Sequence, residues 1–574
     1  MTEPARLPIN PTLRDFEPLL LAEAVVLRAA ASGEIAKVSY RRPRSPAPDV
    51  RLRAEFLAFL ARGGGAGAPV VGRRLQIMGA CVIGRLNLAG VTLPLSLWLY
   101  RCSFGSEPDL DGARVRGSLT FADCALPAVH ATGCRIDGDL ALSAGCLIEG
   151  ECLLARSVIG GDLDGERLRL RGAVQAGGTS RRMFVADGAV VRGDVRLSGG
   201  IEFTGTTSLV GARIGGDLLL GGARLTADID SNGARGVALD LDRVRVAGRV
   251  AFDAGFSAAG AVRLLAARIG GDLDCTEAEF DAVGDAGWGE QGGALRLDRG
   301  RIGGALVLRR LQGALQGASL IDAHVGELAD DASTWGQHHT LDGFRYARFA
   351  TDAPTDATTR LAWLTRQHAA EFAPTSQHRP DPWRRAISVM RRMGHAASAS
   401  ELAMGREQHL RAAGVIGSDA RYGLRPVVRA AHAGYGLLAG YGHRPLRLVA
   451  IAIGLWFACA AIYHAAADGF APSATLLAAA PKLTACRPAC AQAPLTLPEF
   501  APLLYSLDLL LPLVDLQQAR HWGPVRQPAS AASAWVGVPP LRLLAAFESA
   551  CGWLLLLTGL LALFGLTDRD RTTG

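Results

Sequence analysis

The sequence predicts a mainly β chain: a parallel β-solenoid followed by a small helical region and two transmembrane α-helices. First, the word IGGDL occurs at residues 159–163, 214–218 and 269–273, so that its copies start 55 residues apart both times. Second, apolar and polar residues alternate within each copy, as expected for a strand with one buried face. Third, two apolar stretches near the C-terminus are each about 20 residues long, which is enough to span a bilayer as a helix.

The N-terminal region, residues 1–69, is expected to be a helical cap. Its segment AEFLAFLAR is helical in character. The first residues, MTEPARLPINPTLRDF, carry an acid at position 3 and no apolar core segment, so we do not expect a signal peptide.

Residues 70–345 are expected to form the solenoid. Words related to IGGDL are centred on a set of glycines spaced mostly 23 and 32 residues apart in turn: Gly84, Gly117, Gly138, Gly161, Gly193, Gly216, Gly248, Gly271, Gly304 and Gly326. An Ile or Val usually stands two residues before this glycine, and a Leu or Val two residues after it. The intervening positions are polar, often Arg before the glycine and Asp after it.

A strand this short cannot bury its apolar face alone, but stacked copies can close over an apolar interior. The pattern predicts roughly a dozen coils, on the order of 50–60 Å long at about 4.8 Å per stacked strand. We expect the central glycine to face inward at a bend, and the extra residues of every second unit to project as loops. An ordinary β-sandwich also alternates, but it does not keep a 55-residue register.

Residues 346–445 are expected to be a basic helical region. Between residues 381 and 447 the chain has 11 Arg and 4 acids. This charge precedes the first apolar stretch, where an anionic membrane leaflet would attract it. The candidate membrane-surface residues are Arg384, Arg385, Arg391, Arg392, Arg425, Arg429, Arg444 and Arg447. The alternative partner, nucleic acid, is disfavoured because interleaved aromatic residues are missing.

The two predicted spans are residues 446–467 and 543–566. Arginines precede the first span, and Arg569 and Arg571 follow the second. Because short Arg-rich flanks stay in the cytoplasm, we expect both termini and the solenoid on the cytoplasmic side of the cell (inner) membrane, with residues 567–574 as a cytoplasmic tail. Residues 468–542 are then an extracytoplasmic loop.

Within that loop, residues 498–518 are expected to form a re-entrant or interfacial helix. Asp508 and Asp515 are seven residues apart, and Glu548 lies early in the second span, so the three make a candidate polar membrane site. Cys486 and Cys490 are expected to form a local disulfide, because the loop would face an oxidising compartment. The 7 cysteines between residues 81 and 275 are expected to be small buried hydrophobes.

The chain resembles a group of bacterial membrane-anchored proteins with degenerate pentapeptide-type repeats and a two-helix C-terminal anchor, sometimes labelled membrane-associated oxidoreductases. The resemblance rests on LRAEFLAFLARGG, on repeats such as GARIGGDLLLGGARL, on GYGHRPLRL and on LLYSLDLLLPLVDLQQ. It covers most of the chain and implies a pentapeptide-like β-helix. The strict five-residue period of true pentapeptide proteins is not kept.

No motif in the sequence specifies a reaction. HExxH, GxSxG and P-loop words are absent, and GGGAGA at residues 63–68 follows a helical segment, whereas a dinucleotide fingerprint follows a strand. We therefore expect no enzymatic activity, no cofactor and no metal site. Two functions remain: a membrane-tethered cytoplasmic scaffold that binds an unidentified protein partner, or an oligomeric two-span cation pore with the solenoid as its regulatory domain.

Overall fold

The computed structural model describes residues 11–171, 181–229, 235–281, 293–367, 381–418, 422–473, 499–524 and 540–563. The chain divides into two compact units, Met1–Ala399 and Ser400–Gly574. Strands fill most of the first unit, and helices fill most of the second.

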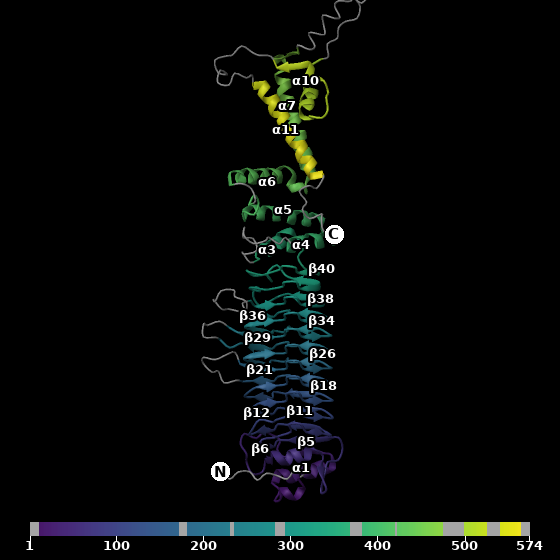
Figure 1. Cartoon of the computed structure of the whole chain (residues 1–574), viewed down its shortest axis with the longest axis vertical. Helices are drawn as coiled ribbons and strands as arrows, with labels where there is room; N and C mark the ends of the chain where they lie inside the picture. Colours follow the sequence, from purple (N-terminus) through teal and green to yellow (C-terminus); the bar gives the residue numbers. More distant parts are fainter. Residues whose placement is uncertain are drawn as a thin grey trace, which may run out of the picture. The chain divides into compact units, whose positions relative to one another are not determined.

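The first unit is a stack of parallel strands (Figure 1). Its largest sheet has 21 strands in two rows that merge at β38 (Arg301–Leu308) and continue through β39 (His324–Asp330) and β40 (Arg345–Phe349). The first row is β7 (Thr92–Leu93), β10 (Arg114–Val115), β14 (Arg135–Ile136), β18 (Val158–Ile159), β22 (Val190–Val191), β26 (Arg213–Ile214), β30 (Arg245–Val246) and β34 (Arg268–Ile269). The second row is β1 (Ile35–Lys37), β5 (Arg74–Met78), β8 (Ser96–Tyr100), β11 (Leu119–Ala122), β15 (Leu140–Ser143), β19 (Leu163–Asp164), β23 (Val195–Arg196), β27 (Leu218–Leu219), β31 (Val250–Ala251) and β35 (Leu273–Asp274).

Two further parallel sheets complete the stack. One has 10 strands: β2 (Arg51–Arg53), β6 (Cys81–Ile83), β9 (Ser103–Phe104), β12 (Ala125–Leu126), β16 (Leu147–Ile148), β20 (Arg169–Leu170), β24 (Glu202–Thr204), β28 (Arg224–Thr226), β32 (Ser257–Ala259) and β36 (Glu279–Asp281). The other has 7 strands: β13 (Val129–His130), β17 (Cys152–Leu153), β21 (Arg182–Val185), β25 (Thr206–Ser208), β29 (Val237–Asp240), β33 (Ala261–Arg263) and β37 (Leu295–Arg296). Each strand pairs with its equivalent one repeat along the chain, which fits a solenoid-like arrangement.

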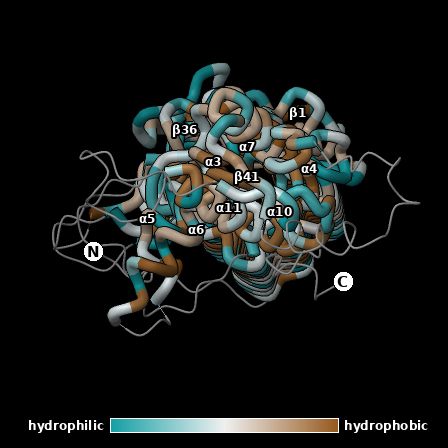
Figure 2. Tube along the Cα trace, turned by 90° about the horizontal axis from the view of Figure 1, so that it is seen from above, coloured by the Kyte–Doolittle hydropathy of each residue, from teal (hydrophilic) through white to brown (hydrophobic). Residues whose placement is uncertain are grey.

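The strand register confirms the alternating pattern. Ile159, Ile214 and Ile269 lie in one buried column, with Val191 and Val246 between them. The three leucines that end the IGGDL words lie in a second buried column: Leu163, Leu218 and Leu273. Seen from above, hydrophobic and hydrophilic residues are interspersed along the Cα trace (Figure 2). The apolar residues of the repeat therefore line the interior of the stack.

The glycine at the centre of each word does not face inward as the sequence predicted. Gly216 is partly exposed, at the corner between β26 and β27. A Cβ atom on it would lie 2.0 Å from Oδ1 of Asp194, which belongs to the coil before. The same oxygen accepts a hydrogen bond from the backbone N–H of Asp217 at 2.9 Å. Glycine fits there because the aspartate of the preceding coil fills the space, and a larger residue would have to displace that carboxylate.

This arrangement repeats along one edge of the stack as an aspartate ladder. Each side-chain oxygen accepts the backbone N–H of the equivalent residue one coil further on, at 2.6 to 3.1 Å. The ladder is built by Ser96, Ser118, Asp139, Asp162, Asp194, Asp217 and Asp272. The repeated Gly–Asp pair thus joins one coil to the next.

The N-terminal cap contains η1 (Leu13–Phe16), α1 (Leu21–Ser32) and α2 (Ala54–Ala61), but the sheets begin inside it. β1 pairs with β5 and β2 pairs with β6, so the stack starts at Ile35 and not near residue 70 as the sequence predicted. Buried Glu23 of α1 holds Arg53 through two hydrogen bonds of 2.6 and 2.7 Å. This ion pair ties the helix to β2.

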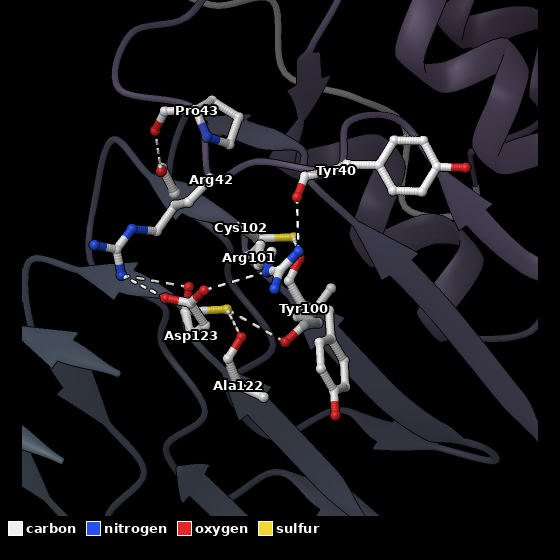
Figure 3. A network of polar contacts seen from close by, with 11 residues as sticks. Tyr40, Arg42, Pro43, Tyr100, Arg101, Cys102, Ala122 and Asp123 are labelled. Carbon is white, nitrogen blue, oxygen red and sulfur yellow. Dashed lines mark hydrogen bonds and ion pairs between the residues drawn. The ribbon is translucent and has the colours of Figure 1, made fainter. Parts of the chain in front are cut away.

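An irregular segment, residues 38–50, is fastened to the first coils by the polar contacts in Figure 3. Arg42 Nη1 donates to Oδ1 of Asp123 at 3.1 Å, and Arg101 Nη1 donates to the carbonyl of Tyr40 at 2.7 Å. The paired residues are more than 60 positions apart in the sequence, so no local sequence pattern predicts these contacts.

The other end of the stack is covered by α3 (Ala357–Thr365) and α4 (Asp381–Arg392), in the region where the sequence predicted helices. Arg360 of α3 and Asp330 of β39 form a buried ion pair with hydrogen bonds of 2.7 and 2.8 Å. The guanidinium of Arg360 also lies 3.8 Å from the centre of the Phe349 ring. A buried charge pair of this kind needs both partners, because either one alone would be costly.

The second unit contains α6 (Arg425–Ala439), α7 (Pro445–Ala465), α9 (Pro502–Leu510), α10 (Gln518–His521) and α11 (Pro540–Leu563). α5 (Ala396–Ala412) crosses the boundary between the units. The short elements are η3 (Tyr422–Leu424), η4 (Gly440–Gly442), η5 (Ala467–Gly469) and the antiparallel pair β41 (Phe470–Pro472) and β42 (Trp522–Pro524). In the first unit, β3 (Gly64–Gly65) and β4 (Ala68–Pro69) form a hairpin after α2, at the glycine cluster.

Both predicted spans fall on helices that are long and apolar enough to cross a membrane: Pro445–Ala465 and Pro540–Ala562. Within the most apolar 18 residues of each helix, only 22% and 17%, respectively, are buried inside the protein. α9 packs against both of them.

Candidate polar site between the apolar helices

The one carboxylate that the sequence predicted in the second span, Glu548, is fully buried at the centre of a polar cluster. Tyr463 of α7 donates its hydroxyl to Oε2 of Glu548 at 2.8 Å. The hydroxyl of Ser506, from α9, contacts Oε1 of Glu548 and also the carbonyl of Trp456 at 3.1 Å. The cluster therefore joins α7, α9 and α11 through one side chain.

The geometry explains how α9 packs against both long helices. Trp456 donates its indole N–H to the carbonyl of Leu503 at 2.9 Å, which fixes the start of α9 on α7. A Cβ atom on Gly552 would lie 2.3 Å from the carbonyl oxygen of Leu510, so the glycine lets the end of α9 approach α11. An apolar cluster of Cys459, Tyr463, Phe470 and Tyr505 adjoins the site.

Asp508 and Asp515 do not join Glu548, contrary to the grouping that the sequence predicted. Asp508 accepts the backbone N–H groups of Leu516 at 2.7 Å and Ala519 at 2.8 Å. Asp515 accepts the N–H of Gln517 at 2.9 Å. These two carboxylates shape the turn between α9 and α10, because each is occupied by local backbone donors.

The basic residues are divided between the two units. In α4, Arg385 donates to the carbonyl of Tyr346 at 2.9 Å and Arg392 to that of Ala347 at 3.2 Å. Burial lowers the pKa of the Arg385 guanidinium. Arg385 is thus bound to the last strand of the stack and is not the free surface cation that the sequence predicted. Arg391 is exposed and Arg384 is half-buried, and both lie on the same helix.

The remaining four predicted surface arginines lie in the second unit. Arg425 and Arg429 are on α6, and Arg444 and Arg447 stand at the start of α7. Arg444 contacts Glu401 at 3.2 Å, and Arg447 donates to the carbonyl of Leu437 at 3.5 Å. Their positions place positive charge beside the first residues of the apolar helix.

The cysteines of the stack are all buried, as predicted. Burial raises the pKa of the Cys146 thiol to about 12, so at neutral pH it is protonated and poorly reactive. Cys486 and Cys490 lie outside the described residues, so their predicted disulfide remains a prediction. Across the described ranges, no group of three or more His, Cys, Asp or Glu side chains is arranged to hold a metal ion.

Sequence reasoning missed Tyr463 and Ser506, the two hydroxyl donors to Glu548. Tyr463 stands 85 residues before Glu548 and Ser506 stands 42 residues before it, so no local motif links the three. One signal was available: an acid inside an apolar span needs hydrogen-bond partners from neighbouring helices. Comparison with known proteins adds no further candidate, since no family model, curated protein or solved structure matches the chain.

Proposed function

We propose that this chain is a membrane-tethered protein whose parallel β-solenoid, of degenerate pentapeptide-like type, acts in the cytoplasm as a non-enzymatic scaffold for a protein partner. The observation that carries the proposal is the pair of exposed apolar helices that follows the strand stack. The resemblance to membrane-anchored pentapeptide-type proteins supports the same reading.

The exposed side chains of α7 and α11 support a membrane anchor. Leu446 of α7 is 80% exposed, and Phe547 and Leu554 of α11 are 57% and 54% exposed. A core helix of a water-soluble protein would bury such residues, whereas a bilayer solvates them. The polar atoms of Glu548 are bonded inside the unit, as the hydrocarbon interior requires.

α6 supports an orientation. It carries exposed apolar residues, Val427 at 61% and Leu437 at 72%, together with Arg425 and Arg429. A helix of this composition suits the interface between lipid headgroups and water, and arginines there favour the anionic cytoplasmic leaflet. Arg444 and Arg447 add to the positive charge on the same side, which by the positive-inside rule is cytoplasmic.

The pore is the weaker candidate on this geometry. A cation pathway needs carboxylates that face water, but Glu548 is buried and accepts two hydroxyl contacts. Asp508 is held by two backbone N–H groups, and Asp515, although exposed, lies 3.3 Å from the guanidinium of Arg520. A two-span chain would also need several copies around one pore, so the mass of the detergent-solubilised protein separates the two functions: a closed ring would favour the pore.

Topology is the direct test of the tether. Single cysteines are placed at Ser198, in the first unit, and at Ser530, in the loop between the spans and outside the described residues, with Cys486 and Cys490 changed to Ser. In spheroplasts of a bacterial host, a membrane-impermeant maleimide should label Ser530→Cys and should label Ser198→Cys only after permeabilisation. Recovery of the chain in the soluble fraction would refute the tether, and the reverse labelling pattern would place the stack outside the cell.

A further inference from the structure

A column of arginines runs along the first row of the large sheet. Strand register places Arg213, Arg245, Arg268 and Arg301 opposite one another on four successive strands, β26, β30, β34 and β38. All four are exposed. The column continues on β39 and β40 with the exposed residues His324 and Arg345. Figure 1 shows β26, β34 and β38 one above another along the stack.

A groove of about 1040 Å³ lies beside this arginine column and is lined by strands from β22 to β39. Two residues after each column member from Arg213 to His324 stands a Gly or Ala, which leaves the groove without a bulky side chain: Gly215, Ala247, Gly270, Gly303 and Gly326. The glycines cannot readily be replaced. A Cβ atom would lie 2.2 Å from the carbonyl oxygen of Arg192 at Gly215, and 2.2 Å from that of Ala247 at Gly270. The backbone packing of the coils therefore keeps the floor of the groove open.

The charge of the column is not balanced locally. Elsewhere on the stack, arginines meet acids: Arg196 lies 2.7 Å from Asp162, and Arg263 lies 2.5 Å from Asp242. Within the described parts of the chain, no Asp or Glu oxygen lies within 4.0 Å of the guanidinium groups of the four column arginines. Like charges directly opposite on neighbouring strands are unfavourable, so the column is a feature that an anionic ligand would stabilise.

We propose that the arginine column and its groove bind an extended acidic segment of a partner polypeptide. This inference rests on the proposed scaffold function and names the chemistry of the partner. Guanidinium groups pair with carboxylates through two parallel hydrogen bonds, which fits acidic side chains. From β22 to β39 the groove crosses five strand spacings, or roughly 24 Å, which corresponds to about seven extended residues.

The other anionic partners fit less well. The residues that line the groove include no Phe, Tyr or Trp, so bases of a single-stranded nucleic acid lack the large aromatic side chains on which they usually stack. A lipid bilayer is broad, and its surface does not enter a groove floored by glycine. An extended peptide backbone can approach glycine closely.

The test uses the full chain in detergent and a fluorescent octaglutamate peptide, with binding followed by anisotropy. The variant Arg245→Gln/Arg268→Gln should weaken peptide binding at least tenfold. The matched control Arg224→Gln/Arg249→Gln removes the same charge from the same part of the stack, but at arginines that face Glu202 and Asp217. The control should change binding less than twofold. Equal losses in the two variants, or no binding by the unaltered chain, would overturn the proposal.

Two further probes identify the class of ligand. An oligo(dT) strand and anionic phosphatidylglycerol vesicles are titrated against the unaltered chain and the Arg245→Gln/Arg268→Gln variant. Tighter binding of either probe than of the peptide, with the same dependence on Arg245 and Arg268, would replace the peptide by nucleic acid or lipid and so refute the assignment. The peptide-binding result is independent of the proposed membrane anchor. A water-soluble chain that binds the peptide through the arginine column would refute the membrane anchor but not the binding site.

Discussion

At the scale of single residues, the repeated Gly–Asp pair joins neighbouring coils, because the aspartate of one coil packs against the glycine of the next. The carboxylate of Asp194 occupies the place where a side chain on Gly216 would stand, and it accepts the N–H of Asp217. The repeat also contains its own exception. Arg249 replaces the aspartate in one coil, and at the next glycine, Gly271, a Cβ atom would meet only backbone atoms at 3.1 Å or more.

This exception provides a matched pair of variants. Gly216→Ala should destabilise its coil by about 1–3 kcal/mol, because the new methyl group displaces the Asp194 carboxylate from its hydrogen bond. Gly271→Ala should cost less, because no carboxylate occupies that space. Native-state hydrogen exchange of the full chain measures both local opening free energies. Equal costs at the two positions would show that the aspartate ladder does not determine the glycine.

At the scale of elements, a buried histidine contributes to the packing of α3 on the last coils. His339 is fully buried and shares a hydrogen bond of 2.7 Å between its Nε2 atom and the carbonyl of Trp363. Burial lowers the pKa of His339 to about 4. The imidazole is therefore neutral at pH 7 and donates its N–H to the helix.

This pKa predicts acid sensitivity of the α3 contact. Since the folded pKa lies below the ordinary value of about 6.5, the unfolded state binds the proton more tightly, and stability falls as the pH falls from about 6.5 toward 4. The loss should reach roughly 2 kcal/mol at pH 5. Hydrogen exchange of residues 357–367 at pH 7.5 and pH 5, corrected for the intrinsic rate, measures it.

The control for this prediction is His339→Gln, which keeps an N–H donor but does not titrate in this range. The variant should lose most of the extra pH dependence, whereas His324→Gln, at an exposed position of the same stack, should keep it. An unchanged pH dependence in His339→Gln would assign the effect to other groups.

At the scale of the whole molecule, the first unit gains stability from contacts between neighbouring coils. Leu218 is fully buried, and its strand pairs with Val195 on one side and Val250 on the other. A defect in one coil therefore removes the support of the next, as in other repeat proteins. In the second unit, the polar cluster around Glu548 and the adjoining apolar cluster join α7, α9 and α11.

Leu218→Asp tests this dependence. An unpaired carboxylate in the interior costs several kcal/mol, so amide protection should be lost from about residue 190 to residue 251. The control Leu219→Asp changes the next residue of the same strand, whose side chain is not fully buried, and should leave protection nearly unchanged. Retained protection in Leu218→Asp would mean that the strand register is wrong.

The sequence by itself determined the parallel strand stack, its inward columns and the two apolar helices, because these depend on periodicity and length. Ile159 and Leu163 could be placed inward from alternation alone. Periodicity could not reveal that β1 joins the sheet at Ile35, since one short strand carries no repeat. It also could not reveal that Asp194 of one coil excludes a side chain at Gly216 of the next.

Only the tertiary structure decided which polar residues meet. Glu548 is hydrogen-bonded to Tyr463 and Ser506, which stand 85 and 42 residues before it in the sequence. Asp508 and Asp515 instead accept hydrogen bonds from nearby backbone N–H groups. The arginine column likewise exists only when coils are stacked, because its members are 23 to 33 residues apart in sequence and adjacent in the sheet. Apolar burial follows local pattern, but hydrogen bonds and charge pairs depend on contacts that folding brings together.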